Sequence, residues 1–137
     1  MTHVKYSLVT AILVLVLLSC NCPLFVPEIT IELSDLKLCQ GWDVAGEPMV
    51  FSENPHPDDT RICICGHLET NVDDVYLQIF WSREKTNLLR HRQDFRNGPF
   101  LSCIEQDEGF EPGYYSAVVI AGKRELGRVD FRVGEGR

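Results

Sequence analysis

The stretch RICICGHLE, residues 61–69, carries residue types that bind metals or take part in redox reactions. Cys63, Cys65 and His67 alternate along it. Thiolate and imidazole are ligands that suit copper and zinc. In a protein exported to an oxidising compartment, the same cysteines instead indicate disulfides. Cys39 and Cys103 raise the number of thiols available to either chemistry to four.

Alternation along a strand places these groups on one face. Successive side chains of a strand point to opposite sides, so Ile62, Ile64 and Leu68 face the core while the thiols and His67 face outward. The segments around Cys39 and Cys103 alternate in the same way. The residues expected on the core side there are Leu36, Leu38, Phe100 and Ile104. The pattern predicts four thiols on the outer face of one sheet.

The elements that must position these thiols are short strands throughout. Period-two alternation, broken every 8 to 15 residues by Gly, Pro, Asn or Asp, is typical of an all-β sandwich. Strands are expected at 29–33, 36–39, 61–68, 75–81, 100–105, 114–120 and 126–133, with a weak edge strand at 88–92 and a short extended piece at 49–51. We expect about seven antiparallel strands in one domain over residues 29–137. Aromatic residues at Trp81, Phe100, Tyr115 and Phe131 are expected to fill its core.

Three segments carry a resemblance. They are FSENPHPDDTRICICGHLET (51–70), VYLQIFWSREKTNLL (75–89) and GFEPGYYSAVVIAGKRELGRVDFRV (109–133). Together they resemble small immunoglobulin-like or fibronectin-like sandwiches of bacterial secreted and lipid-anchored surface proteins. The resemblance implies that Tyr115 makes the tyrosine corner of such sandwiches, with its hydroxyl against backbone. It implies no catalytic or binding residues.

The sandwich makes the three cysteine-bearing strands neighbours, with the Cys63–Cys65 strand in the middle. Chain direction then favours disulfides between Cys39 and Cys63 and between Cys65 and Cys103. Both flanking distances lie within disulfide range. Two alternatives remain open: a zinc site of all four thiolates, and a copper site of Cys63, Cys65 and His67.

The N-terminus predicts export. Residues 1–7 carry one lysine, residues 8–18 form an apolar run, and Leu17-Leu18-Ser19 precedes Cys20. A short apolar core ending at a small residue is typical of a secretory signal peptide, and the last four positions resemble a bacterial lipobox. Residues 1–19 are therefore expected to be removed, Cys20 to be lipidated, and residues 20–28 to form a spacer. The predicted location is the bacterial cell envelope, with the lipid as membrane anchor.

The charge of the chain limits the classes of partner that we expect. Removal of residues 1–19 takes away Lys5 and changes the net charge from −7 to −8, which argues against nucleic acid. Positive charge gathers in one segment, at Arg83, Lys85, Arg90, Arg92 and Arg96. These side chains form either a solvated face or a patch for an anionic protein or glycan ligand.

Two functions from different classes remain. The first is a non-catalytic envelope module that binds a protein or glycan. The second is a small lipoprotein that handles zinc or copper through Cys39, Cys63, Cys65 and Cys103. No nucleophile elbow, zinc-protease motif or phosphate loop occurs, so the sequence predicts neither an enzyme nor a cofactor and leaves the oligomeric state open.

Overall fold

The computed structural model describes residues 27–134. The predicted signal peptide and Cys20 lie outside the described residues. Within 27–134 the chain is all-β, and no helix there is long and apolar enough to cross a membrane. The strands are β1 (Ile31–Trp42), β2 (Pro48–Val50), β3 (Arg61–Thr70), β4 (Val75–Arg83), β5 (Thr86–Phe95), β6 (Gly98–Glu105), β7 (Gly113–Ala121) and β8 (Arg124–Val133).

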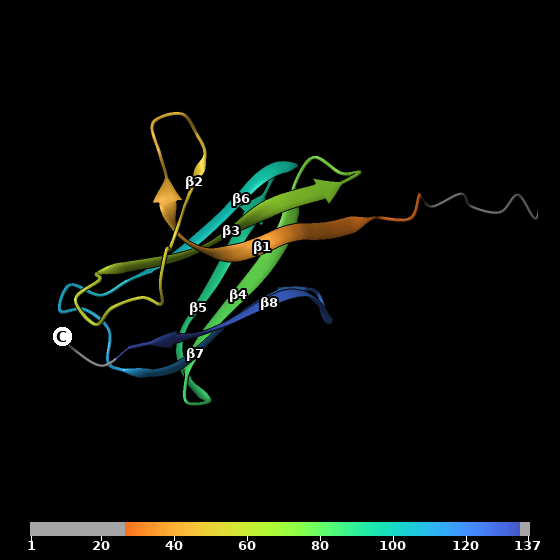
Figure 1. The fold of residues 1–137 in the computed structure, drawn as a ribbon. Coiled ribbons are helices and arrows are strands. Elements are labelled where there is room, and N and C mark those ends of the chain that lie inside the picture. The colour runs from red at the N-terminus through yellow and green to blue at the C-terminus, as the bar shows by residue number, and fades with distance from the viewer. Residues whose placement is uncertain (1–26, 135–137) are drawn as a thin grey trace, which may run out of the picture.

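The eight strands form two antiparallel sheets that pack face to face (Figure 1). The first sheet has the order β2-β1-β3-β6 and the second the order β5-β4-β7-β8. The predicted sandwich is therefore confirmed, with eight strands where about seven were expected. The predicted neighbours of the Cys63–Cys65 strand are confirmed too, because β3 lies between β1 and β6.

The two short strands expected at 29–33 and 36–39 are one strand with a bulge. The register of β1 on β3 shifts between Ser34 and Lys37, and Asp35 has a positive φ of 53°. Aspartate tolerates this conformation better than most residues. Gly66 lies against the bulge, where a Cβ atom would stand only 2.7 Å from the Ser34 carbonyl oxygen. The extra residue keeps both Leu33 and Leu36 against the core.

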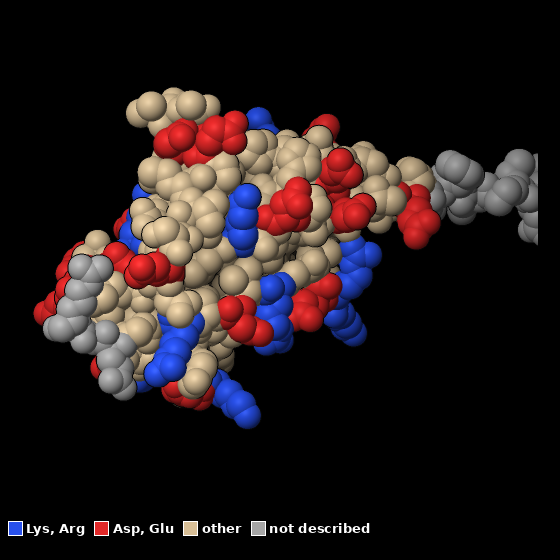
Figure 2. Space-filling view, in the orientation of Figure 1, with Lys and Arg blue, Asp and Glu red and all other residues tan. Residues whose placement is uncertain are grey.

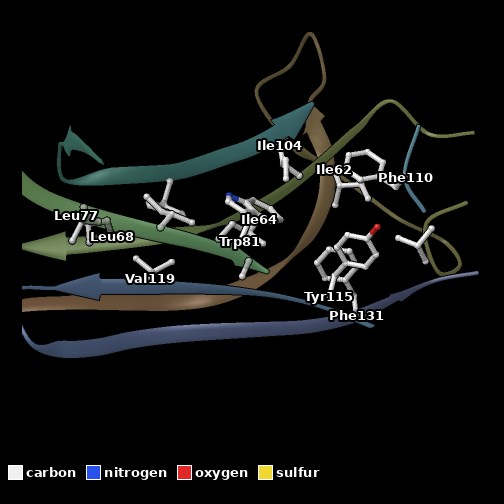
Figure 3. Packing of buried hydrophobic residues seen from close by; sticks show 14 of the residues in the cluster. Ile62, Ile64, Leu68, Leu77, Trp81, Ile104, Phe110, Tyr115, Val119 and Phe131 are labelled. Carbon is white, nitrogen blue, oxygen red and sulfur yellow. The ribbon is translucent and has the colours of Figure 1, made fainter. Parts of the chain in front are cut away.

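The core lies between the sheets and centres on aromatic side chains (Figure 3). Trp81, Phe100, Tyr115 and Phe131 are all buried, as the alternation predicts. Tyr115 stacks on Phe131 with ring centres 5.4 Å apart, and Trp81 meets Phe131 edge to face at 6.4 Å. Much of the remaining core is aliphatic and comes from β3, β4 and β7; it includes Ile62, Ile64, Leu68, Leu77, Ile79 and Val119.

The predicted tyrosine corner is present. The Tyr115 hydroxyl donates a 2.6 Å hydrogen bond to the Glu111 carbonyl oxygen, four residues earlier. This bond holds the loop before β7 against the strand. It also satisfies a hydroxyl that would otherwise be buried without a partner.

Candidate functional site

The outer face of the first sheet holds the four domain cysteines in two disulfides. Cys39 is bonded to Cys65, and Cys63 to Cys103. The outward direction predicted for the thiols holds, because their neighbours Ile62 and Ile64 belong to the core between the sheets. The sulfurs nevertheless lie in a second, separate apolar cluster rather than in solvent.

The predicted connectivity was wrong, and the register explains why. Cys63 lies directly opposite both Cys39 and Cys103, and it can form a disulfide with only one of them. Its Cα atom is 4.0 Å from that of Cys103, and the nearer flank of an antiparallel strand carries the non-hydrogen-bonded pair. Cys63 bonds on that side. Cys65, which lies opposite Lys37, then reaches Cys39 along the diagonal at a Cα distance of 6.2 Å.

The end of β1 covers these disulfides. After Cys39 the strand shifts register against β2, and Gly41 has a φ of 130°. This turn brings Trp42 against the sulfur cluster, where Leu101 joins it from β6. Cys39, Cys63 and Cys65 are at most 1% exposed, whereas Cys103 is partly exposed.

The copper alternative receives no support from this arrangement. Cys63 and Cys65 are oxidised, and a disulfide sulfur is not a thiolate ligand. His67 is exposed and lines a hollow of about 350 Å³ beside Trp42, Lys37 and Pro99. Within residues 27–134 no group of His, Cys, Asp or Glu is arranged to hold a metal ion.

The structure divides the predicted basic patch. Arg83 forms a 2.9 Å ion pair with Glu111 and donates to the Pro112 carbonyl oxygen, and Arg96 pairs with Asp74. These two arginines serve neighbouring turns. The other three predicted members lie on the β4–β5 hairpin with exposed side chains; they are Lys85, Arg90 and Arg92.

The second sheet presents an unusual outer face. The outward face of a sandwich strand is normally polar. The outward positions of β4 and β7 here include five apolar or aromatic side chains: Tyr76, Phe80, Tyr114, Val118 and Ile120. Tyr76 and Tyr114 are 51% and 63% exposed. We call these five residues the apolar stripe.

Arginines border the apolar stripe on both sides. The Arg90 guanidinium of β5 lies 4.8 Å from the centre of the Phe80 ring. The Arg132 guanidinium of β8 lies 5.5 Å from the centre of the Tyr114 ring. Arg90 also donates two hydrogen bonds to the Gln78 side chain. Stacking of this kind fixes a guanidinium plane. Because Nε and Nη2 of Arg90 bond Gln78, a ligand would meet the Nη1 end of this guanidinium.

A groove of about 650 Å³ lies at one end of the apolar stripe, where Tyr114 and Arg132 meet the β4–β5 turn. A second hollow of about 390 Å³ adjoins it towards Val118 and Ile120. The two hollows share Ser82, Lys85, Ser116 and Arg128. The shared lining is therefore two serines and two basic residues, and Glu84 and Asp130 also line the larger groove.

Sequence reasoning missed the β8 side of this surface. Arg128 and Arg132 lie far along the chain from the basic segment, and only the pairing of β7 with β8 brings them to it. The alternation Arg128, Asp130, Arg132 was the available clue, because it marks a polar face at the end of this strand. On the side of the molecule seen in Figure 2, basic and acidic side chains are interspersed.

The phenol of Tyr115 makes the fold sensitive to alkali. Burial raises the pKa of Tyr115, and the Glu111 and Glu84 carboxylates add to this, while Arg83 opposes it. Because the pKa of Tyr115 is raised in the folded state, its contribution to the free energy of unfolding is fully present below the unfolded-state pKa of about 10. That contribution is lost as pH rises through the folded-state pKa.

We therefore expect the free energy of unfolding to fall above about pH 10, and Tyr115→Phe to remove part of that fall. Urea unfolding from pH 8 to 11 measures it. The control is Tyr114→Phe, which changes an exposed phenol next in sequence. An alkaline slope that is identical in wild type and Tyr115→Phe would contradict the assignment.

Comparison with models of protein families finds no match, and comparison with curated proteins finds none. The fold and its surfaces define an antiparallel two-sheet sandwich with a disulfide-linked face and an arginine-bordered apolar face.

Proposed function

We propose that the chain is a non-catalytic binding module of the bacterial cell envelope, held to a membrane by lipid on Cys20. The observation that carries the binding role is the apolar stripe with Arg90 and Arg132 over its aromatic rings. On the outer face of the first sheet, the apolar residues are already gathered in the disulfide cluster with Trp42 and Leu101. The second sheet supplies the face that lacks a cover within residues 27–134.

The proposed ligand is an extended protein segment with alternating carboxylate and apolar side chains. Apolar side chains match Val118 and Ile120, and carboxylates match the planar donor edge of a guanidinium. A neutral sugar would stack on aromatic ring faces, but one face of both Phe80 and Tyr114 is already occupied by an arginine. Charge complementarity therefore favours an acidic protein segment over a glycan.

The binding role predicts the behaviour of a simple probe. A decapeptide of alternating glutamate and valine should bind the full chain and shift the backbone amide resonances of β4, β7 and β8. Replacing Arg90 and Arg132 together by glutamine should weaken binding about tenfold, since each exposed charge contact contributes about 0.7 kcal/mol. Added salt should weaken it further.

The matched control is Arg96→Gln, which removes an arginine that pairs with Asp74. It should bind like the wild type. Equal binding of a lysine–valine decapeptide would contradict the charge argument. If a sulfated glycan bound at Arg90 and Arg132 while the acidic peptide did not, the ligand would be a glycan and the protein proposal would be wrong.

The location proposal rests on the residues before the domain and on the cysteines within it. The apolar run 8–18 and the motif ending at Cys20 indicate export with lipidation. Two disulfides support the same reading, because they persist in oxidising compartments. Several acyl chains would hold the protein at the membrane more firmly than one.

Metal handling is the second candidate function, and it requires that both disulfides be reduced. Four sulfurs within one cluster would offer zinc a complete ligand set only as thiolates. In the oxidised form we expect dialysis against zinc to leave no metal on the protein. Metal retained by the oxidised protein, and lost in Cys65→Ser, would favour this candidate over the binding module.

A further inference from the structure

The four domain cysteines allow two disulfide pairings rather than one. Cys39, Cys63 and Cys103 form a row across β1, β3 and β6, because each is directly opposite the next. Cys65 projects from the same face of β3, two residues after Cys63. Cys65 is opposite Lys37 of β1 and Leu101 of β6. Cys39 and Cys103 lie two residues further along those strands, so each of them is diagonal to Cys65.

The observed pairing and one alternative each combine one bond across the row with one bond on the diagonal, although the observed pairing uses the closer Cys63–Cys103 contact, with Cα atoms 4.0 Å apart. In the observed pairing Cys63 bonds Cys103 across the row, and Cys65 bonds Cys39 on the diagonal. In the alternative, Cys63 bonds Cys39 across the row, and Cys65 bonds Cys103 on the diagonal. Directly opposite residues lie within disulfide range on either flank.

The third connectivity is excluded by strand spacing. Cys39 and Cys103 are two strands apart, or about 9.6 Å, which exceeds the range of a disulfide. The alternative pairing shortens the observed loops of 26 and 40 residues by two residues each. Loop entropy therefore hardly distinguishes the two pairings, and packing of the folded domain decides between them.

One sulfur gives access to this cluster. Cys103 is partly exposed, whereas the other three cysteines are at most 1% exposed. The Arg61 Nη2 atom lies 3.4 Å from the Cys103 sulfur. The Arg61 side chain is about half exposed, and its Nε atom lies 3.4 Å from Oε1 of the more exposed Glu105. A guanidinium beside a sulfur attracts an incoming thiolate and stabilises a thiolate formed there.

We propose that Cys103 is a thiol-exchange site, at which a small-molecule thiol interconverts the two pairings. The thiolate attacks the Cys103 sulfur, the Cys63–Cys103 bond breaks, and Cys63 leaves as a thiolate. Cys63 then attacks Cys39 directly opposite, which releases Cys65 as a thiolate. Cys65 attacks Cys103 and expels the small thiol. Two disulfides exist before and after, so no oxidant or reductant is consumed.

This exchange acts on the end of β1. Cys39 changes its partner by two residues along β3, and Cys39 immediately precedes the bulge that carries Trp42 over the cluster. The interconversion therefore reorganises the cover of the first sheet and leaves the core between the sheets unchanged.

The test is disulfide mapping of the full chain after incubation with a catalytic amount of reduced glutathione without oxygen. Exchange is stopped by acid and maleimide before digestion. Cys63 and Cys65 lie on one peptide, so electron-transfer fragmentation must cleave the backbone between them to show which of the two is bonded to which partner. We expect the Cys39–Cys63 and Cys65–Cys103 pairing to appear while the number of free thiols stays constant. Unchanged pairing, or new free thiols without new pairing, would overturn the proposal.

Arg61→Gln is expected to slow the exchange several-fold, whereas Arg92→Gln, on the other sheet, should leave the rate unchanged. Equal rates in all three proteins would remove Arg61 from the mechanism. Thermal unfolding of each variant checks that it is folded.

A second measurement avoids kinetics. In the domain, the variant Cys65→Ser with Cys103→Ser leaves Cys39 and Cys63, which should form a disulfide with each other in air, while Cys20 and Cys22 stay present before the domain. The variant Cys39→Ser with Cys103→Ser leaves two thiols on one strand, nearly 7 Å apart, which should stay free. Failure of Cys39 and Cys63 to pair in a folded variant would overturn the proposal. Both tests read sulfur pairing alone, so they are independent of the proposed binding function.

Discussion

Replacing Cys63 and Cys103 together by alanine is expected to lower the free energy of unfolding by about 4 kcal/mol. The two residues are 40 positions apart in sequence, and the chain-entropy relation gives about 4 kcal/mol for a loop of that length. Cys63 is also fully buried, so its sulfur contributes packing against Leu101 and Trp42. Urea unfolding without reductant measures the change.

The matched comparison is the pair Cys39→Ala with Cys65→Ala. That disulfide closes 26 residues, so the expected loss is about 3.5 kcal/mol by the same relation. A small sandwich with about 5–15 kcal/mol of stability should then tolerate loss of one disulfide better than loss of both. A loss below about 1 kcal/mol in either variant would show that the cross-links do not stabilise this fold in the way the relation describes.

Trp81→Ala is expected to destabilise the domain by about 3–5 kcal/mol, the range for removal of a large buried aromatic. Trp81 is 1% exposed, lies at the centre of the core and meets the edge of Phe131. Alanine would leave a cavity between two sheets whose backbones are fixed by their ladders. Chemical unfolding followed by circular dichroism measures the loss.

Trp81→Phe separates packing from hydrogen bonding. The indole Nε1 of Trp81 has no hydrogen-bond partner within residues 27–134. Phenylalanine keeps most of the ring and removes this unpaired donor, so it should cost far less than alanine. If the alanine and phenylalanine variants unfolded at the same urea concentration, the central position of Trp81 in the core would be wrong.

Alternation allowed prediction of the strands that bury one face. Ile62, Ile64 and Leu68 mark β3, and the predicted bounds 61–68 fall two residues short of Thr70. The bulge at Asp35 hid the continuity of β1, because a register shift interrupts the period on which the prediction depends. β5 was expected only at 88–92, yet it covers Thr86–Phe95. As an edge strand it buries little on either face, so its sequence shows no clear period.

The pairing of the cysteines and the extent of the binding face depend on register. Local alternation predicts that Cys63 and Cys103 share one face, but it does not predict that they lie opposite each other. A register shift of two residues would give each of them a different partner. Arg132 meets Tyr114 only because the β7–β8 ladder pairs these two positions. Such contacts join segments whose spacing in sequence carries no periodic signal.

A lipid-anchored, disulfide-linked sandwich can be tested by intact mass spectrometry of the native protein, isolated from membranes and treated with maleimide before and after reduction. We expect a chain that begins at an acylated Cys20, with Cys39, Cys63, Cys65 and Cys103 labelled only after reduction. A soluble chain that begins at Met1 and has all four of these cysteines labelled before reduction would contradict both the membrane anchor and the cross-linked sheet.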